Sequence, residues 1–308
     1  MKKIAISVGD LNGIGIELAL KNHHIVKEIV QPIYCIDSIM LDRASTLLNI
    51  DTPKDFEIVH KIAKPFKIRA GEITRESGVY SFASFLKAIE LAKLQDVDGV
   101  MTLPINKKAW EEAGVKYKGH TDALRDFFHR DAIMMLGVPS MFVALYTEHI
   151  PLKDVAKEIR DISKLSNFLI DFYNSIDLKT NEEIALLALN PHAGDGGVLG
   201  DEERDIIKAK SIAEKFIGDE VYTNPIVPDI AFTPNFRKNY RYFVAMYHDQ
   251  GLAPLKTLYF DESINISLNL PIKRTSVDHG TAFDIAYKKG RELNSLSYIN
   301  GLRYFNRE

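Results

Sequence analysis

Three histidines share one sequence context, because each follows a short apolar run with the composition of a β-strand. They are His149 after Phe142–Tyr146, His192 after Ile184–Leu189, and His248 after Tyr242–Met246. Three imidazoles can bind one divalent metal ion and leave further coordination positions open. The alternative is that each is a hydrogen-bonded structural histidine. The H-E-x-x-H signature of many zinc proteases is absent from the sequence.

Basic residues come shortly after the last of these histidines. Lys256, Lys273 and Arg274 bring positive charge toward the predicted metal site, and small polar residues follow Arg274 directly. A guanidinium matches the geometry of phosphate oxygens, and an ammonium adds a point charge. Such charges often form a solvated surface, but the residues after Arg274 favour the lining of a phosphate site.

A second polar cluster joins the segment Thr102–Lys107 to Lys118-Gly119-His120-Thr121-Asp122. Thr121 or Asp122 could cap the helix that follows, and the positive end of that helix would suit an anion such as phosphate. The alternative is that Thr121 serves only as a cap and that His120 is a surface histidine whose hydrogen bonds are satisfied.

A glycine-rich segment, Gly9–Glu17, follows the first predicted strand. Gly13 and Gly15 supply the first two glycines of the dinucleotide fingerprint G-x-G-x-x-G, but Leu18 occupies the third position. A glycine-rich turn at the start of a helix is also a common structural device. The sequence therefore disfavours an ordinary Rossmann cofactor site.

Strands and helices alternate along the chain, which predicts an α/β protein with a parallel or mixed sheet. The predicted strands are Ile4–Val8, Ile33–Ile36, Phe56–Val59, Gly99–Leu103, Ala132–Leu136, Phe142–Tyr146, Ile184–Leu189 and Tyr242–Met246. The clearest helical patterns are Gly78–Leu94, Leu152–Ile176 and Glu202–Phe216. The runs Ala132–Leu136 and Phe142–Tyr146 predict an antiparallel pair. Open α/β sheets bind ligands at the carboxyl ends of their strands, which is where the polar clusters fall.

The composition suits a globular protein, since 46% of the 308 residues are hydrophobic. A formal net charge of −3, from 39 basic and 42 acidic residues, gives no electrostatic reason to expect nucleic acid or an anionic membrane as partner. Cys35 is the only cysteine and lies in an apolar run, so we expect a buried thiol. The sequence shows neither a signal-peptide pattern nor a membrane-spanning run, so we expect a cytoplasmic protein.

Five segments together resemble the 4-hydroxythreonine-4-phosphate dehydrogenase (PdxA) family, in the same order and over nearly the whole chain. They are Gly9–Glu17, Pro104–Lys107 with Gly119-His120-Thr121, Asn190–Gly194, Tyr247–Lys256 and Arg274–Ala282. The resemblance implies an α/β, two-lobed fold like that of isocitrate and isopropylmalate dehydrogenases, with mixed sheets and no Rossmann fingerprint. We expect residues 1–118 and 280–308 to form the first lobe and 119–279 the second, with the active site in the cleft between them.

The resemblance also implies a role for individual residues. The implied ligands of a divalent metal, Zn²⁺, Mg²⁺ or Co²⁺, are His149, His192 and His248. The residues implied to hold the substrate and its phosphate are His120, Thr121, Lys256, Asn265 and Arg274. The residues implied to contact the cofactor, NAD or NADP, are Gly194, Gly196, Gly197, Asp278 and Thr281. Asp229 matches an acidic residue near the metal. The family site lies at a homodimer interface, to which the partner chain contributes one metal histidine.

The reaction implied by the resemblance is an oxidation followed by decarboxylation. A divalent cation on the secondary hydroxyl of 4-phosphohydroxy-L-threonine lowers its pKa, and a base takes the proton. Hydride passes to the nicotinamide, and loss of CO₂ then gives 3-amino-2-oxopropyl phosphate, an intermediate of pyridoxal 5′-phosphate (vitamin B6) biosynthesis. Lys256, Asp229 and a metal-bound water are each candidates for the base.

The sequence departs from the family pattern at several positions without losing an implied ligand. Leu11, Asn12 and Ile16 replace Pro, Ala and Pro in the first motif. The other departures are Asp195 for Glu, Asn269 for Gly and Ile230 for Thr. They affect the expected shape of the pockets and not the reaction class.

Three other functions compete with this interpretation. A related dehydrogenase could act on a phosphorylated sugar acid, 4-phospho-erythronate or 4-phospho-threonate, with the same metal and phosphate site. A metal hydrolase would use the three histidines to activate water and would need no nicotinamide. A non-catalytic phosphate-binding protein would keep its ligand after loss of the metal.

Overall fold

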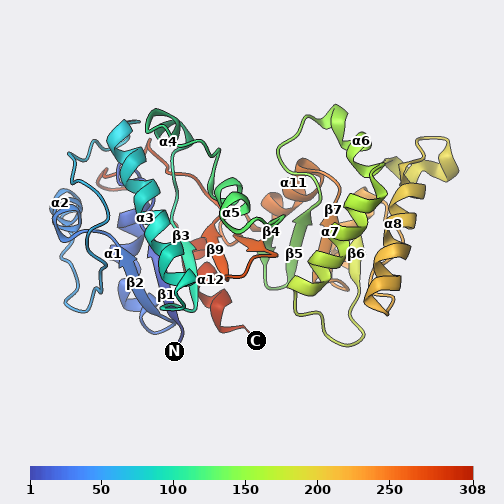
Figure 1. The fold of residues 1–308 in the computed structure, drawn as a ribbon, viewed down its shortest axis with the longest axis horizontal. Coiled ribbons are helices and arrows are strands. Elements are labelled where there is room, and N and C mark those ends of the chain that lie inside the picture. Colours follow the sequence, from blue (N-terminus) through green and yellow to red (C-terminus); the bar gives the residue numbers. More distant parts are fainter. Residues whose placement is uncertain (308) are drawn as a thin grey trace. The chain divides into compact units, whose positions relative to one another are not determined.

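The computed structural model describes residues 1–307, which form two compact units (Figure 1). Unit 1 contains Met1–Arg130, Ile264–Ile266 and the described residues from Leu270 onward, and unit 2 contains Asp131–Ser263 and Ser267–Asn269. The expected fold class, an α/β protein with two lobes and both parallel and antiparallel strand pairs, is confirmed. None of the helices in residues 1–307 has the length and hydropathy of a membrane span.

Unit 1 is built on parallel strands in the order β2-β1-β3-β9. Their bounds are β1 (Lys3–Ser7), β2 (Gln31–Cys35), β3 (Gly99–Thr102) and β9 (Arg274–Val277). The main helices are α1 (Gly15–Val26), α2 (Ser38–Leu48), α3 (Arg75–Lys93) and α12 (Leu296–Arg303). Both faces of the strands are buried, because one core joins α1, α2 and α12 to Ile4 and Ile6, and another joins α3 to Ala5 and Ile33. Strands β1, β2 and β3 therefore consist mainly of apolar residues.

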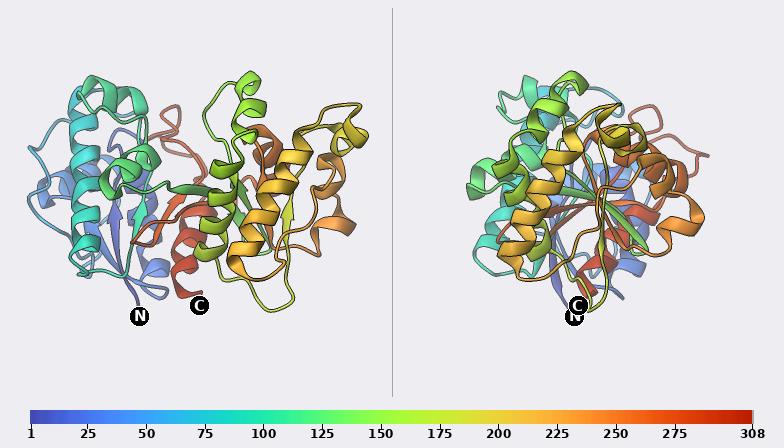
Figure 2. Two further views of the ribbon diagram at one scale, coloured as in Figure 1. Left: turned by 45° about the vertical axis from the view of Figure 1, so that its right-hand side comes forward. Right: turned by 90° about the vertical axis from the view of Figure 1, so that its right-hand side faces the viewer.

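Unit 2 has strands in the order β4-β5-β7-β6. Their bounds are β4 (Ile133–Val138), β5 (Met141–Leu145), β6 (Ile184–Leu186) and β7 (Tyr242–Ala245). The predicted antiparallel pair is confirmed as β4 and β5, while β5 and β6 each run parallel to β7. The main helices are α7 (Ile162–Ser175), α8 (Glu202–Ile217) and α11 (His248–Tyr259). Helices α7 and α8 lie side by side, as the turned views in Figure 2 show.

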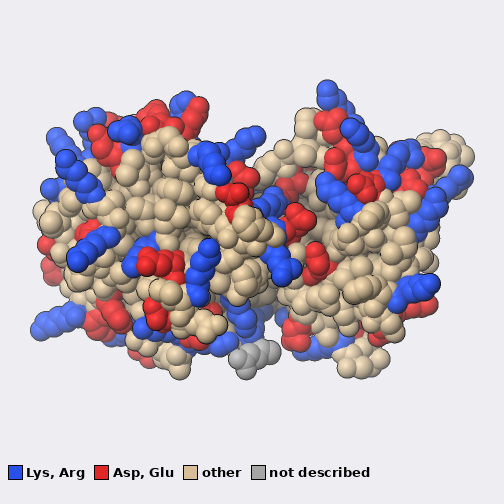
Figure 3. All heavy atoms as spheres, viewed as in Figure 1, with Lys and Arg blue, Asp and Glu red and all other residues tan. Residues whose placement is uncertain are grey.

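The remaining elements are short and connect these layers. They are α4 (Lys107–Glu112), α5 (His120–Phe128), η1 (Leu152–Asp154), α6 (Val155–Ile159), η2 (Pro191–Gly197), α9 (Pro228–Ala231), α10 (Pro234–Arg237), β8 (Ile264–Leu268) and η3 (Tyr304–Asn306). Strand β8 is divided between the units after Ile266. On the face shown in Figure 3, acidic and basic side chains are interspersed on each unit, in keeping with the small net charge.

The unit boundaries differ from the predicted lobes in three segments. Residues 119–130, 264–266 and 270–279 belong to unit 1, whereas the sequence placed them in the second lobe. Helix α5 stays with unit 1 because the rings of His120 and Phe127 pack on Phe85 of α3, with ring centroids 4.7 and 6.2 Å away. Strand β9 stays there because Thr102 of β3 pairs with Ser276.

Two predicted elements need correction, and two strands were not predicted. Phe56–Val59 is not a strand, since only one isolated bridge joins Ile58 to Tyr34. The predicted helix Leu152–Ile176 is divided into η1, α6 and α7. Its break falls at Asp161, whose side chain caps α7 by accepting a hydrogen bond from the Lys164 N–H. Strands β8 and β9 lacked a recognisable apolar pattern and were absent from the prediction.

Two single-residue features follow from the fold. The backbone of Asn269 has a φ of 57°, which explains why a glycine suits this position and why asparagine, which tolerates left-handed geometry, can replace it. Its side chain donates hydrogen bonds to Asp171 Oδ2 and to the Asp131 carbonyl at 2.9 and 3.2 Å. The expected burial of Cys35 is confirmed, and burial raises the pKa of its thiol to about 12.

Candidate functional site

The three histidines follow the carboxyl ends of three strands of unit 2, as the sequence indicated. His149 lies four residues beyond β5, His248 lies three residues beyond β7 and begins helix α11, and His192 lies in η2 beyond β6. Because β5, β7 and β6 are parallel to one another, all three histidines come from the same edge of the sheet.

His149 and His248 lie together, with ring centroids 5.8 Å apart. A divalent ion lies about 2 Å from each imidazole nitrogen that binds it, so two rings at this separation can share one ion after small side-chain rotations. Thr147 joins the segment after β5 to the segment after β7, because its hydroxyl donates a 2.6 Å hydrogen bond to the Met246 carbonyl. Asp249 Oδ1 lies 2.7 Å from His248 Nδ1, which favours a proton on Nδ1 and leaves Nε2 as the ligand atom.

In the segment His248–Gly251, the last two residues, Gln250 and Gly251, each have a structural role. The buried Gln250 side chain accepts a hydrogen bond from the Met246 N–H and donates one to the Ala188 carbonyl, each of 2.7 Å, and so joins the ends of β7 and β6. A Cβ built at Gly251 would lie 2.7 Å from Val143 Cγ1. Glycine at this position therefore lets α11 approach β5 closely.

His192 lies on a turn with unusual backbone geometry. Five successive residues, His192 to Gly196, have φ between 45° and 79°, and three of them are not glycine. Left-handed backbone costs a non-glycine residue about 1–2 kcal/mol, so the surrounding contacts must hold this turn in place. Within residues 1–307, no three His, Cys, Asp or Glu side chains form a complete metal site, so a single chain brings together His149 and His248 but not all three histidines.

The segment that carries Asp229 is joined to β6 near this turn. The Ile226 N–H donates to the Leu186 carbonyl and the Ala188 N–H donates to the Ile226 carbonyl, at 2.8 and 2.9 Å. Asp229 itself is exposed on the short helix α9, which contacts η2. The acidic side chain and His192 therefore lie on adjacent elements of unit 2.

Unit 1 contains a buried cationic site around Arg274. Only 2% of Arg274 is exposed, its Nη2 donates a 2.6 Å hydrogen bond to Thr102 Oγ1, and burial lowers the pKa of its guanidinium to about 9. His120 is buried as well, and burial together with the charge of Arg274 holds its pKa well below the usual 6.5. A buried cation beside a neutral imidazole favours an anionic ligand, whose charge would offset that of the guanidinium.

The surroundings of His120 contradict the alternative interpretation, in which it is a surface histidine with satisfied hydrogen bonds. Its Nε2 is buried and has no hydrogen-bond partner among residues 1–307, so His120 is not a satisfied surface histidine. Helix α5 begins at His120, but Gly119 is its N-cap and no side chain caps it, so neither Thr121 nor Asp122 has the predicted capping role. Asp122 Oδ2 instead accepts a hydrogen bond from the Lys118 N–H at 3.0 Å.

The other two predicted substrate residues lie in different units. Asn265 is on β8, next to β9, and its Oδ1 is buried without a hydrogen-bond partner among the described residues. Lys256 is a half-buried residue of α11 in unit 2, with its Nζ 5.6 Å from the centre of the Phe260 ring. His120, Asn265 and Arg274 therefore belong to unit 1, and Lys256, His149, His192 and His248 belong to unit 2.

The predicted cofactor glycines have different surroundings. A Cβ at Gly194 would lie 2.7 Å from Glu203 Oε2, so this glycine is needed for internal packing. Gly196 and Gly197 are exposed. In unit 1, the Thr281 carbonyl accepts a hydrogen bond from the Ile14 N–H, so the Asp278–Thr281 turn contacts the glycine-rich segment Gly9–Glu17.

Polar contacts within unit 1 hold the Gly9–Glu17 segment in place. Asp10 is fully buried and accepts hydrogen bonds from the Asn12 N–H and the Ser77 hydroxyl, at 2.9 and 3.0 Å. The Asn12 side chain donates to the Glu72 carbonyl and to Thr74 Oγ1. The departure Asn12 therefore joins this segment to the residues that precede α3.

We expect Asp10→Asn to stabilise the protein at alkaline pH. Burial raises the pKa of Asp10 from 3.8 to about 6, so between these values the unfolded chain releases a proton that the folded chain keeps. The free energy of unfolding therefore falls as the pH rises through this window. At roughly 1.4 kcal/mol per unit of pKa shift, the full loss is about 3 kcal/mol. Asparagine can donate to Ser77 Oγ while that hydroxyl donates to the Thr74 carbonyl, an acceptor 3.0 Å away.

Urea unfolding of both proteins at pH 5 and pH 8 measures this effect. The variant should gain stability over the wild type at pH 8, and the gain should shrink by about 1–2 kcal/mol at pH 5. An equal difference at the two pH values would show that Asp10 does not titrate in this range.

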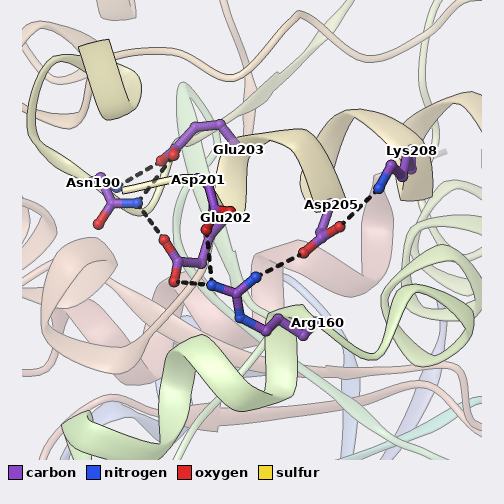
Figure 4. Close-up of polar contacts among 7 residues, drawn as sticks. All are labelled: Arg160, Asn190, Asp201, Glu202, Glu203, Asp205 and Lys208. Carbon is purple, nitrogen blue, oxygen red and sulfur yellow. Dashed lines mark hydrogen bonds and ion pairs between the residues drawn. The ribbon is translucent and has the colours of Figure 1, made fainter. Parts of the chain in front are cut away.

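Sequence reasoning missed the residues that hold the His192 turn, which are shown in Figure 4. Glu203 is buried at the start of α8 and accepts hydrogen bonds from the N–H groups of Leu189 and Asn190, at 3.0 and 2.7 Å. The acidic run Asp201-Glu202-Glu203, at the start of the predicted helix Glu202–Phe216, does not by itself indicate this role.

Comparison with known proteins identifies the family of this chain. The family model described as "Pyridoxal phosphate biosynthetic protein PdxA" matches residues 28–304. The 4-hydroxythreonine-4-phosphate dehydrogenase of Sulfurimonas denitrificans is 58% identical over 301 residues, which cover 98% of this chain and 96% of the relative. The protein of the same name from Campylobacter fetus is 51% identical over 305 residues, covering 99% and 97%.

Solved structures show the same fold. The crystal structure of 4-hydroxythreonine-4-phosphate dehydrogenase from Klebsiella pneumoniae has a TM-score of 0.82 and 30% identity, with 99% of each chain covered. A terephthalate 1,2-cis-dihydrodiol dehydrogenase from Burkholderia xenovorans has a TM-score of 0.63 at 23% identity over 99% of this chain and 97% of its own, which shows likeness of fold alone. This chain therefore belongs to the PdxA family of pyridoxal phosphate biosynthetic proteins.

Proposed function

We propose that this chain is an NAD(P)- and divalent-metal-dependent dehydrogenase that oxidises 4-phosphohydroxy-L-threonine and decarboxylates it to 3-amino-2-oxopropyl phosphate. The observation that carries the proposal is the 58% identity, over nearly the full length of both chains, to a protein named 4-hydroxythreonine-4-phosphate dehydrogenase. The site chemistry supports it, because a buried guanidinium suits a phosphate and paired imidazoles suit a divalent metal ion.

Binding of the substrate phosphate is assigned to unit 1 in this proposal. Arg274 would supply charge-assisted hydrogen bonds, and the free Nε2 of His120 would form a further one. The N-terminus of α5, where Thr121 lies in the first turn, would add a favourable dipole. Asn265 Oδ1 would accept a hydrogen bond from the substrate.

Metal binding is assigned to the histidines of unit 2. His149 and His248, with ring centroids 5.8 Å apart, would share one ion, and His192 would complete the set in a homodimer in which at least one ligand comes from the partner chain. Neutral imidazoles fit Zn²⁺ or Co²⁺ better than Mg²⁺. Asp249 holds the imidazole of His248 in the tautomer that can bind.

The reaction needs both a hydride acceptor and a base. When bound, the nicotinamide accepts the hydride and the divalent ion polarises the substrate hydroxyl. Lys256, on the same helix as His248, and Asp229, on the element next to η2, are the two side chains proposed to take the proton. The cofactor is proposed to contact Gly196 and Gly197 and the turn with Asp278 and Thr281, while Gly194 supports the loop from within.

The competing functions receive less support. The relatives with 58% and 51% identity are both named for 4-hydroxythreonine-4-phosphate, which disfavours a sugar acid phosphate as the main substrate. The same names disfavour a hydrolase and a non-catalytic binding protein, because both describe a dehydrogenase.

The test is NADH formation from 4-phosphohydroxy-L-threonine and NAD⁺ by the purified, metal-loaded protein, with and without a chelator. We expect chelator-sensitive formation of NADH together with CO₂, and slower turnover of 4-phospho-erythronate and 4-phospho-threonate. A preference for either sugar acid phosphate would transfer the substrate assignment to that compound. Phosphate release without nicotinamide would instead support the hydrolase.

A further inference from the structure

The turn that carries His192 is held by side chains that lie outside the proposed metal site. The N–H groups of Leu189 and Asn190 both donate to Glu203 Oε1, at 3.0 and 2.7 Å. The Asn190 side chain donates to Glu203 Oε2 at 3.0 Å and to Glu202 Oε2 at 2.8 Å (Figure 4). The first residues of α8 thus bind the backbone immediately before the turn.

The turn itself packs on the same carboxylate. Gly194 lies against Glu203, and Gly200 lies against Asn190. A Cβ on Gly194 would lie 2.7 Å from Glu203 Oε2 and a Cβ on Gly200 would lie 2.3 Å from Asn190 Nδ2, so either would clash. The Leu199 N–H donates to the Gly194 carbonyl at 3.0 Å and closes the loop. Glu203, with 7% of its surface exposed, is the central group of this arrangement.

An outer layer of ion pairs holds the acidic residues. Arg160 Nη2 lies 2.9 Å from Glu202 Oε1 and 2.8 Å from Asp201 Oδ1, and its Nη1 lies 3.4 Å from Asp205. The Arg160 side chain is half exposed, so these ion pairs contribute less than the buried contacts of Glu203.

We propose that Glu203 is a positioning residue for the metal ligand His192, acting through Asn190, with Arg160 and Glu202 as its outer support. The five left-handed residues from His192 to Gly196 do not form a self-stabilising element, so the place of the imidazole depends on what holds the turn. Contacts behind a metal ligand set its orientation and so its affinity for the ion. The inference rests on the proposed metal site and extends it to residues that do not touch the metal.

Helix α8 offers a matched control. Glu214 is also buried, with 8% exposed, and its Oε1 accepts hydrogen bonds from the N–H groups of Val221 and Tyr222 at 3.1 and 3.0 Å. It holds a loop in the same way as Glu203, but that loop bears none of the three proposed metal ligands. Substitution of either glutamate should therefore lower the stability of the protein, but only substitution of Glu203 should lower its metal affinity.

The experiment measures Co²⁺ affinity by visible absorption in the full-length protein, for Glu203→Ala, Glu203→Gln and Glu214→Ala. We expect Glu203→Ala to weaken Co²⁺ binding by about 10- to 100-fold and Glu214→Ala to leave it within about twofold of the wild type. Glu203→Gln should restore part of the affinity, because its amide oxygen still accepts from the two backbone N–H groups while its NH₂ opposes that of Asn190. This variant also provides the test if Glu203→Ala does not fold.

Failure of the inference can be told from failure of the proposed function with His192→Ala. If His192→Ala binds Co²⁺ as tightly as the wild type, His192 is not a ligand and the proposed metal site is wrong. If His192→Ala loses affinity while folded Glu203→Ala and Glu203→Gln keep it, the metal site stands and the positioning role of Glu203 is refuted. Equal losses in the Glu203 and Glu214 variants would also refute it, because the effect would then be general destabilisation.

Discussion

Arg274→Met is expected to lower kcat/KM for 4-phosphohydroxy-L-threonine by about 10²- to 10³-fold, the range that follows loss of a buried, hydrogen-bonded charge pair. The guanidinium is buried beside His120 and keeps its charge at neutral pH, because its lowered pKa is still about 9. A phosphate in this site would gain a charge-assisted bond and would offset a buried charge. The kcat/KM of Arg274→Lys should lie between those of Arg274→Met and the wild type, since an ammonium keeps the charge but lacks the planar fork of a guanidinium.

Stability measurements separate this binding role from a structural one. Without ligand, Arg274→Met should unfold no more easily than the wild type, because replacement of a buried charge by an apolar side chain is often neutral or stabilising. Inorganic phosphate should raise the Tm of the wild type and leave that of the variant unchanged. A variant that phosphate stabilises as strongly as the wild type would place the phosphate elsewhere.

The same substitution has a signature in the titration of His120. The charge of Arg274 adds to burial in lowering the pKa of this histidine. Arg274→Met should therefore raise that pKa while leaving it below 6.5, as measured by NMR. Because the folded-state pKa is depressed, this histidine lowers stability as the pH falls below about 6.5, the value in the unfolded chain. The loss on acidification should be smaller in the variant.

Mixing two inactive variants of the metal site is expected to restore activity. His192→Ala and His248→Ala should each reduce turnover by at least about 10²-fold, because a divalent site with two imidazoles binds its metal poorly. If those two histidines of one site come from different chains, each mixed dimer contains one intact site. A random mixture of the two variants should then recover about one quarter of wild-type activity, since about half of the dimers are mixed.

The control for this result is a mixture of wild-type chains with chains that carry both His192→Ala and His248→Ala. If His192 and His248 of one site come from different chains, a mixed dimer of this kind has no intact site, so activity should come only from wild-type dimers. If the mixture of single variants stays inactive although the chains exchange, both histidines bind the metal from one chain. That outcome would contradict the assignment in which His192 crosses to the pair formed by His149 and His248.

Local sequence patterns were sufficient for the part of the site that follows directly from strands. The apolar runs before His149, His192 and His248 predicted their shared edge of the sheet, because a short segment shows where a strand ends and open α/β sheets bind ligands at the carboxyl ends of their strands. The antiparallel pair β4 and β5 was predicted because only a short connection separates the two apolar runs. The family motifs then supplied roles that no single pattern carries.

Features that depend on distant packing could not be predicted. Arg274 lies in a strand, Arg-Thr-Ser-Val, that has no apolar alternation and is buried only because it pairs with β3. His120 is buried because Phe85 and Trp110 pack around it, although the residues beside it are polar and glycine. The role of Glu203 arises from its contact with a loop 13 residues earlier, to which nothing in the acidic run points.

The single thiol of the chain provides a reporter of opening motions. Cys35 is completely inaccessible at the end of β2, and its raised pKa keeps it protonated at neutral pH. A thiol reagent can therefore label the protein only when unit 1 opens around this strand, so the labelling rate at high reagent concentration equals the opening rate. The wild-type sequence thus allows the kinetics of unit 1 to be followed at one chemical group, without introducing a probe.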